Sequence, residues 1–485
     1  MKVIFLKYKN RFAGFIFYVL IQLCFSSPIF SQQNNILYFM PGIPEANYLN
    51  PAIQAPCRVN VGLPLISSFY LNYGNTAFSL NDAAPLSGDT ARVISPENII
   101  ANMHNLDFIS VETHFNYLFV GAWVKNMYFN FSIQDKIDVR VSLPSDVIAM
   151  GVFGNSNFVG ETIKLNRVGA NVNYYREYAL GASYNWSDYL KIGAKAKLLF
   201  GKISVNSKKT KIGLTTDQYT HNLYLESDVR LNASFPLSHN GNLESIALPE
   251  SVDIKQLLLN RKNPGFALDA GFIYQYDERF SYSASIIDLG FMRFRDNLLN
   301  VEEEGEIGFE GVDFNEILEN QTFSLMIEDS LLNAFRIEGK TDKYFYFLPT
   351  KLYVGGQYHI FSKLSFGMLA KAEIFQYRIT PSFTASLNSR LLRAFHTTVT
   401  YSYNNYTFNN IGFGFSLQSR NLQFYMISDN ALGFFKPVQT RNINLRFGIN
   451  LFFGCKKREK TDKEDCYWIK KNTRKKLLKE KLLNK

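Results

Sequence analysis

The sequence predicts an all-β protein, a transmembrane antiparallel β-barrel of about 14 strands, with roughly 12 to 18 as the range. Three observations predict it. The chain begins with an export signal, its residues alternate between apolar and polar in stretch after stretch, and no later segment is apolar for the 18 or so residues of a membrane helix. Aromatic residues make up 15% and charged residues 19% of the chain, which excludes a disordered protein.

The first 31 residues are predicted to be a cleaved signal peptide. A basic stretch is followed by an apolar run from Phe12 to Phe25, then by small residues up to Ser31. The alternative is an N-terminal membrane anchor, but the apolar run is short for a spanning helix. The mature chain is therefore expected to be exported.

The positive charge lies at the two ends of the chain. The formal net charge is +10, and residues 1–11 together with residues 456–485 account for more than all of it. The body is slightly acidic, whereas a nucleic-acid-binding protein would carry its basic residues on the folded body. No nucleic-acid partner is predicted.

Period-two alternation is clearest near the C-terminus, over residues 442–453. Every second residue there is Ile, Leu or Phe, and the other row is mostly Asn, Arg and Gly. Similar rows run over 190–200, 266–274 and 364–374. A soluble β-sandwich or solenoid would also alternate, but with polar outward rows. A sheet that faces lipid must close on itself, so a barrel in the outer membrane, with its lipid as a partner, is expected.

The polar rows of these strands are predicted to face the lumen. Charged residues on them are candidates to line the lumen or to brace it by salt bridges: Lys191, Lys195, Lys197, Asp269, Lys371, Glu373 and Arg446. His359 and His396 fall on inward positions as well. Tight polar turns near 186–188, 276–279, 361–363 and 419–421 are placed on the periplasmic side, where such barrels have short turns.

Three segments interrupt the expected barrel of residues 58–454. Residues 32–57 contain four prolines and are predicted to form an N-terminal lead-in or plug, with a flexible leader as the alternative. Residues 291–348 carry thirteen acidic and five basic side chains and form an expected extracellular insert. Short helices are expected near 145 and 251–260. Residues 455–485 form a basic tail that is expected in the periplasm.

Three cysteines follow the signal peptide, namely Cys57, Cys455 and Cys466. In a closed barrel the first strand pairs with the last, so a Cys57–Cys455 disulfide at the periplasmic rim is a hypothesis. Its rivals are a Cys455–Cys466 pair and free thiols. No catalytic motif, metal-ligand spacing or nucleotide loop is found, so no enzyme activity, metal or cofactor is predicted.

The chain resembles a known group of proteins. Met40-Pro41, Asn50-Pro51-Ala52 and Leu348-Pro349-Thr350 are similar to segments of an uncharacterised (DUF-type) outer-membrane β-barrel family of Bacteroidota. Asn50-Pro51-Ala52 is also similar to the start of fatty-acid-transporter-like barrels. The resemblance implies the fold and an outer-membrane location, and it supplies no catalytic residues.

Two functions are consistent with this sequence. The first is porin- or transporter-like passage or docking of a ligand, for which a hydrophobic molecule is one option. The second is a non-conducting accessory barrel that binds periplasmic or secretion-machinery proteins through the acidic insert and the basic tail.

Overall fold

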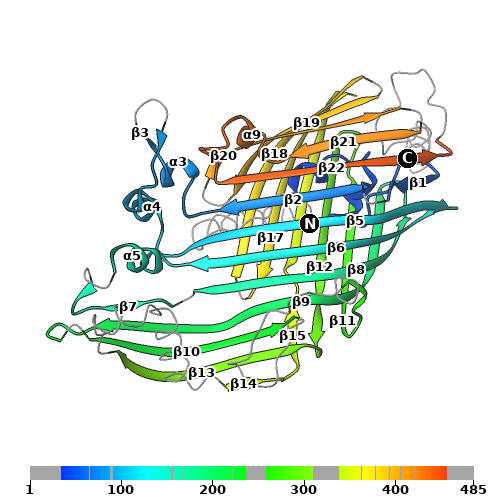
Figure 1. Ribbon diagram of the computed structural model, residues 1–485. Helices are drawn as coiled ribbons and strands as arrows, with labels where there is room; N and C mark the ends of the chain where they lie inside the picture. The colour runs from blue at the N-terminus through cyan, green and yellow to red at the C-terminus, as the bar shows by residue number, and fades with distance from the viewer. Residues whose placement is uncertain are drawn as a thin grey trace, which may run out of the picture.

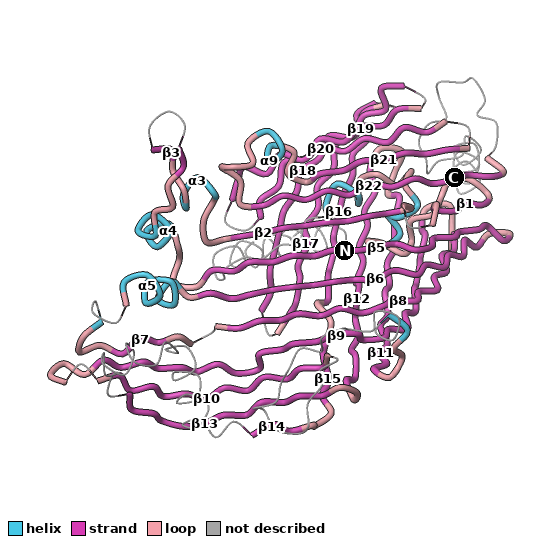
Figure 2. Tube along the Cα trace, in the orientation of Figure 1, coloured by secondary structure: helices cyan, strands magenta, loops and turns pink. Residues whose placement is uncertain are grey.

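A computed structural model of the chain describes residues 34–455 except 65, 88–90, 155–157, 167, 221, 236–257, 310–337, 362, 377, 393, 405–406 and 420. The predicted signal peptide and basic tail lie outside the described residues. Strands dominate the fold and helices are few and short, as Figure 2 shows.

The strands close into an antiparallel barrel of 14 strands, which confirms the predicted fold class. The first wall strand is broken into β1 (Val59–Gly62) and β2 (Ser68–Asn75), and the eighth into β15 (Tyr344–Phe347) and β16 (Thr350–Phe361). The other wall strands are β5 (Asp107–Val124), β6 (Met127–Leu143), β8 (Gly169–Asn185), β9 (Leu190–Thr216), β11 (Asn263–Gln275), β12 (Phe280–Phe294), β17 (Leu364–Phe375), β18 (Arg378–Leu392), β19 (Phe395–Asn404), β20 (Thr407–Gln418), β21 (Leu422–Ser428) and β22 (Asn442–Phe453).

The barrel closes where the first strand meets the last. Val59 of β1 pairs with Phe453 of β22, and Phe69 of β2 pairs with Phe447. The first wall strand bulges between β1 and β2, because the single residue Ile449 of β22 accepts from the Leu63 amide and donates to the Ile66 carbonyl. Closure leaves no open edge along the wall, which is the condition for a sheet in lipid.

Short turns gather at one end of the barrel and longer connections at the other (Figure 1). The four predicted turns all lie at the first end, here called the short-turn end. The opposite, long-loop end carries the shorter elements α3 (Leu80–Ala83), β3 (Leu86–Ser87), β4 (Ala91–Arg92), α4 (Pro96–Asn102), α5 (Ser145–Phe153), β7 (Thr162–Lys164) and α9 (Leu432–Phe435). Among the described residues no helix is long and apolar enough to cross a membrane.

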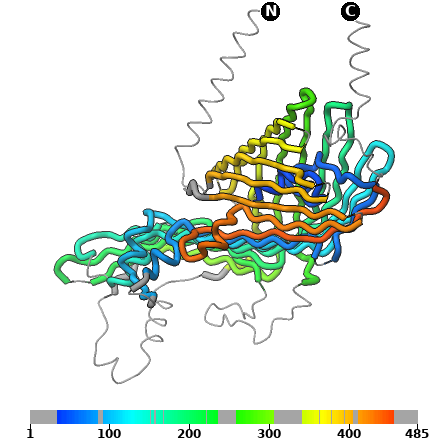
Figure 3. The backbone as a smooth tube through the Cα atoms, turned by 90° about the horizontal axis from the view of Figure 1, so that it is seen from above, coloured from blue at the N-terminus to red at the C-terminus, as the bar shows by residue number. Residues whose placement is uncertain are grey.

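A sheet projects beyond the wall at the long-loop end. The first half of β9 pairs with β11 in the wall, and its second half pairs with β10 (Leu223–Ser234). Next to β10 follow β13 (Leu298–Phe309) and β14 (Glu338–Lys340). Figures 1 and 3 show this sheet extending to the left of the barrel. Of the segment predicted as an insert, 291–348, the described residues 291–309 and 338–348 belong to the end of β12, this projecting sheet and β15 with the short connections between them, and residues 310–337 lie outside the described residues.

The alternation of the sequence places the apolar rows outside. On β22 the row with Ile443 faces outward, while Asn444, Arg446 and Asn450 on the other row are buried in the lumen. Large apolar side chains on the outer face are exposed around the wall, among them Leu180, Leu198, Phe272, Val354, Met368 and Phe413. This arrangement is the reverse of a soluble protein and fits a wall that lipid surrounds.

Candidate functional site

The lumen is filled at the short-turn end by an N-terminal segment, residues 34–57, here called the plug. It contains the helix α2 (Asn35–Tyr38) and the 3₁₀ helix η1 (Pro44–Tyr48). Its apolar residues, such as Ile36 and Ile43, form one buried cluster with Tyr353, Leu369 and Tyr425 of the wall. Because prolines interrupt the segment, it folds as short turns that fill a cavity instead of adding a strand.

Hydrogen bonds fasten the N-terminal half of the plug to the wall. The Ile36 amide donates to Asp429 Oδ1 at 2.8 Å, and Asn35 Nδ2 donates to Thr384 Oγ1 at 2.8 Å. The Tyr38 hydroxyl donates to Ser283 Oγ at 2.8 Å. These wall partners come from both the first and the second half of the ring of strands, so the plug is held on more than one side.

Glycines on the inner rows let the plug approach the wall closely. A Cβ atom added at Gly193 would lie 2.3 Å from the backbone of Pro51, and one added at Gly367 would lie 2.4 Å from the ring of Phe39. Any side chain at these positions would displace the plug. The small residues of the predicted polar rows thus serve as its seat.

The Asn50-Pro51-Ala52 motif is a turn inside the plug. Asn50 Oδ1 accepts the Ala52 amide at 3.0 Å, and Asn50 Nδ2 donates to the Phe272 carbonyl of β11 at 3.3 Å. Asn47 donates to the carbonyls of Pro51 and Ile53. The motif therefore forms an Asx turn that also contacts the wall.

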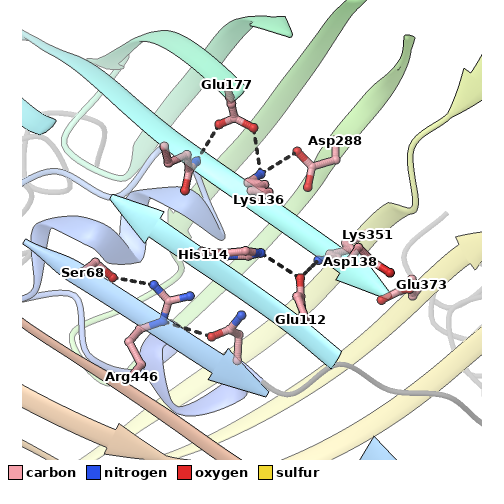
Figure 4. Close-up of polar contacts among 12 residues, drawn as sticks. Ser68, Glu112, His114, Lys136, Asp138, Glu177, Asp288, Lys351, Glu373 and Arg446 are labelled. Atoms are coloured by element: carbon pink, nitrogen blue, oxygen red, sulfur yellow. Dashed lines mark hydrogen bonds and ion pairs between the residues drawn. The ribbon is translucent and has the colours of Figure 1, made fainter. Parts of the chain in front are cut away.

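A charged cluster lies on the long-loop side of the plug, and Figure 4 shows part of it. Lys197 Nζ is 2.7 Å from Asp269 Oδ2 and 2.6 Å from Asp288 Oδ1. Lys136 Nζ is 2.8 Å from Glu177 Oε2. All five side chains are nearly inaccessible to solvent, so each charge depends on its partners.

Two further ion pairs join walls that are nearly opposite in the ring of strands. Lys351 of β16 is 3.1 Å from Glu112 of β5, and Arg140 of β6 is 2.6 Å from Glu373 of β17. His114 contacts the same Glu112 at 3.0 Å. Both pairs reach across the lumen above the plug, and Figure 4 shows Glu112 between His114 and Lys351.

The seven predicted lumen residues all lie on the inner face. Lys197, Asp269 and Glu373 belong to the ion pairs above, while Lys195 and Arg446 contact the plug. Lys195 Nζ donates to the Asn47 carbonyl at 3.3 Å, and Arg446 donates to Asn34 Oδ1 at 3.2 Å and to Ser68 Oγ at 2.7 Å. Lys371 Nζ is 5.9 Å from the ring centre of Tyr353. Lys191 is half-buried near the short-turn end.

Sequence reasoning missed most partners of these residues. Lys136, Asp138 and Arg140 continue the inner row of β6, and extending the alternation of residues 127–133 would have found them. Asp288 sits at an irregular point of β12 with a φ of 60°, so no periodic signal marks it. Glu112 lies in a long strand whose pattern is less regular.

A disulfide joins the C-terminal end of the plug, which runs directly into β1, to the end of the last strand. The structure joins Cys57 and Cys455 by a disulfide, with their Cα atoms 4.4 Å apart. Cys57 precedes β1 and Cys455 follows β22, so the bond spans the seam where the barrel closes. Cys466 lies outside the described residues.

One ion pair lies on the outer face of the wall, near the middle of its strands. Asp135 alternates with the lumen-facing Gln134 and Lys136, and Arg176 alternates with Glu177, so both point outward. Arg176 binds both Asp135 oxygens, at 2.7 and 2.8 Å, and the hydroxyls of Tyr117 and Tyr174 donate to Oδ2. Among the described residues it is the only ion pair on the outer face of the wall near the middle of the strands.

A cavity of about 90 Å³ opens at the short-turn end, between residues 39–43 of the plug and strands β16 to β21. We call it the mouth pocket. His359, Lys363, Arg390 and His396 line it, together with Phe39 and Leu364. In the described part of the chain, no group of three or more His, Cys, Asp or Glu side chains is placed to hold a metal ion.

These features define a class of protein, a transmembrane β-barrel whose inner face is largely polar and whose N-terminal segment lies in the lumen. The chain belongs to the Family of unknown function (DUF5723), whose family model matches residues 51–429. The predicted resemblance to an uncharacterised barrel family is confirmed at this level, and its restriction to Bacteroidota stays a prediction. The chain matches no curated protein.

Several solved structures are similar to this chain. A Pseudomonas aeruginosa FadL homologue is 10% identical, with 88% of this chain and 100% of that chain covered and a TM-score of 0.41. The Pseudomonas putida toluene transporter TodX is 9% identical, with 84% and 92% covered and a TM-score of 0.35. An outer-membrane channel of Pseudomonas putida F1 is 10% identical, with 80% and 97% covered and a TM-score of 0.30. Likeness at this level carries no information about a ligand.

Proposed function

We propose that this protein is an outer-membrane barrel that passes or docks a ligand under the control of its plug. The observation that carries the proposal is the way the plug is attached. Its C-terminal end is bonded covalently to the barrel, to β1 through the backbone and to the end of β22 through the Cys57–Cys455 disulfide, whereas among the described residues hydrogen bonds and apolar contacts hold the rest. Such a plug can move aside and return without leaving the lumen.

The chemistry of the lumen supports passage. The inner rows of β18 and β19 are built from small polar residues such as Thr384, Ser386, Thr398, Thr400 and Ser402. A barrel that served only as a scaffold would gain more stability from an apolar interior. A hydrophobic molecule is one candidate ligand.

The experiment locks the plug. An ideal Cβ at Gly414 lies 2.8 Å from Ile36 Cγ2, so the Cβ atoms of an Ile36→Cys/Gly414→Cys pair come within disulfide reach. The variant is made in a Cys466→Ser background and inserted into planar bilayers in potassium chloride. The Ile36→Ser/Gly414→Ser variant serves as the matched control.

We expect the unlocked barrel to show intermittent conductance steps, because the plug leaves its seat from time to time. Oxidation of the cysteine pair should abolish these steps, and a mild reductant should restore them. If the barrel is silent in every state, passage is rejected.

A silent barrel would favour the second function, a non-conducting accessory that binds partner proteins. The projecting sheet of β9, β10, β13 and β14 is the observation in its favour. It carries Glu302, Glu303 and Glu304 beyond the wall, and strands of this kind offer a surface to a partner. A variant that lacks residues 298–340 would then lose partner proteins that the full chain recovers from envelope extracts.

A further inference from the structure

The mouth pocket brings basic, neutral polar and apolar side chains together in one cavity. It opens at the short-turn end, and the elements that bound it are far apart in the sequence. The pocket runs from the plug, at Met40, to the wall strands β16, β18 and β19. It is thus accessible from the periplasmic side in the predicted orientation.

Every ionisable side chain that lines this pocket is basic. Two basic side chains, Lys363 and Arg390, and two histidines, His359 and His396, line it, and none of its lining residues is Asp or Glu. Arg390 is 8% exposed, so its guanidinium is largely removed from bulk water. Basic groups in a partly enclosed concave site create a positive potential that attracts anions.

A ring nitrogen of His359 adds hydrogen-bonding capacity to the pocket. The buried Nε2 atom of His359 makes no hydrogen bond to another described residue. Gln357, Asn388 and Gln423 also line the cavity, but their amide nitrogens already donate to serines of the wall and, from Gln423, to the Gly42 carbonyl of the plug. Arginine, lysine and histidine side chains together bind carboxylate and phosphate oxygens well, because each supplies N–H donors.

One side of the pocket is apolar and belongs to the plug. Phe39, Met40 and Ile43 face the cavity from the plug, and Leu364 faces it from β17. A ligand that satisfies both sides must carry an oxyanion at one end and an apolar chain at the other.

We propose that the mouth pocket binds an anionic amphiphile through its carboxylate or phosphate group. The head group lies among Arg390, Lys363 and the two histidines, and the apolar chain lies against Phe39 and Met40. The site does not require passage through the barrel, so it stands even if the protein conducts nothing. Because the plug forms one side, an occupied pocket holds the plug in its seat.

Binding is measured on the full chain in lipid nanodiscs, with the histidine rings labelled for nuclear magnetic resonance. The probes are octanoate and octyl phosphate below their micelle concentrations, with octanol for the chain alone and inorganic phosphate for the head group alone. His359→Gln and His396→Gln assign the two resonances. Both charged amphiphiles should shift these two signals, while octanol and inorganic phosphate bind at least tenfold more weakly.

Two variants test the head-group contacts. Arg390→Gln should weaken octanoate binding about tenfold or more, because a hydrogen bond to a charged group contributes about 1.5–3 kcal/mol. Lys363 is exposed in a turn, so Lys363→Gln gives a decisive result even where Arg390→Gln fails to fold. The matched control is Lys209→Gln on the projecting sheet, which removes the same charge far from the pocket.

The proposal fails if octanol binds as tightly as octanoate, if Lys209→Gln weakens binding as much as Lys363→Gln, or if neither histidine signal moves. If inorganic phosphate binds as tightly as octyl phosphate, the apolar chain contributes nothing to binding. The pocket would then be a simple anion site, and the proposal of an amphiphilic ligand would be rejected. An acidic peptide that shifts both signals while the amphiphiles do not would assign the pocket to a protein partner instead.

Discussion

The ion pair between Asp135 and Arg176 makes a specific prediction about stability, because both charges lie on the lipid-facing side of the wall. Arg176 makes two charge-assisted hydrogen bonds to Asp135. The hydroxyls of Tyr117 and Tyr174 also donate to the Asp135 carboxylate. The Asp135 side chain is 2% exposed and that of Arg176 is 16% exposed. Removal of either partner leaves the other without its opposite charge in an apolar environment.

Asp135→Ala is expected to destabilise the barrel by about 2–4 kcal/mol, the range for an arginine exposed to the bilayer interior. Arg176→Ala is expected to cost about 3–5 kcal/mol, since it leaves a nearly buried carboxylate. The double variant Asp135→Leu/Arg176→Leu removes both charges and restores an apolar surface. Its stability is expected within about 1 kcal/mol of the parent protein or above it.

Equilibrium unfolding in urea from lipid vesicles measures these differences, with Trp123 and Trp186 as fluorescent probes in β5 and after β8. The matched control is the solvent-exposed pair Lys340–Glu302, where single removals should change stability by at most about 1 kcal/mol. Single variants at Asp135 and Arg176 that cost less than this control, or a double variant less stable than both singles, would refute a lipid-facing pair.

Four further variants or conditions test other parts of the structure. Cys57→Ser should lower stability by up to about 6 kcal/mol, from the chain-entropy relation applied to a sequence separation of 398 residues, whereas Cys466→Ser should have no effect in the same unfolding assay. Gly193→Val should unseat the plug and raise bilayer conductance, because a Cβ there meets Pro51 at 2.3 Å, while Gly213→Val, with its nearest neighbour at 3.6 Å, should not. Glu112→Gln/Glu373→Gln should raise the frequency of conductance steps by removing the pairs that cross the lumen, and an unchanged frequency would show that the plug alone limits opening. Burial raises the pKa of Glu45 in the plug from 4.5 to about 8, so its contribution to plug seating is fully present below pH 4.5 and is lost as the pH rises from 4.5 to 8; conductance should therefore increase over that interval and level off above pH 8, and Glu45→Gln should abolish that increase.

Much of the barrel follows from local sequence pattern, because the period of two acts residue by residue. The apolar row of residues 442–453 coincides with β22, and the row of 364–374 coincides with β17. The same pattern identified inward lysines such as Lys195 and Lys197, since a strand that faces lipid on one side puts its polar residues on the other. The strand that continues past the wall, β9, was predicted too short, because its polar second half has no membrane to reveal it.

The contacts across the lumen could not be predicted in the same way. Alternation tells which side a residue faces, but Lys351 and Glu112 meet because their strands lie nearly opposite in a closed ring, and that depends on strand number and register. The plug was only suggested by its prolines, since its seat is formed by glycines on strands that follow it by more than 130 residues. Asp135 is a case in which alternation alone predicts the wrong type of residue. Its position in the outer row should hold an apolar residue, and only the partner on β8 explains why a carboxylate is tolerated there. A charged residue that breaks the apolar row of a barrel strand therefore predicts an opposite charge on the neighbouring strand at the paired position, and Arg176 occupies that position.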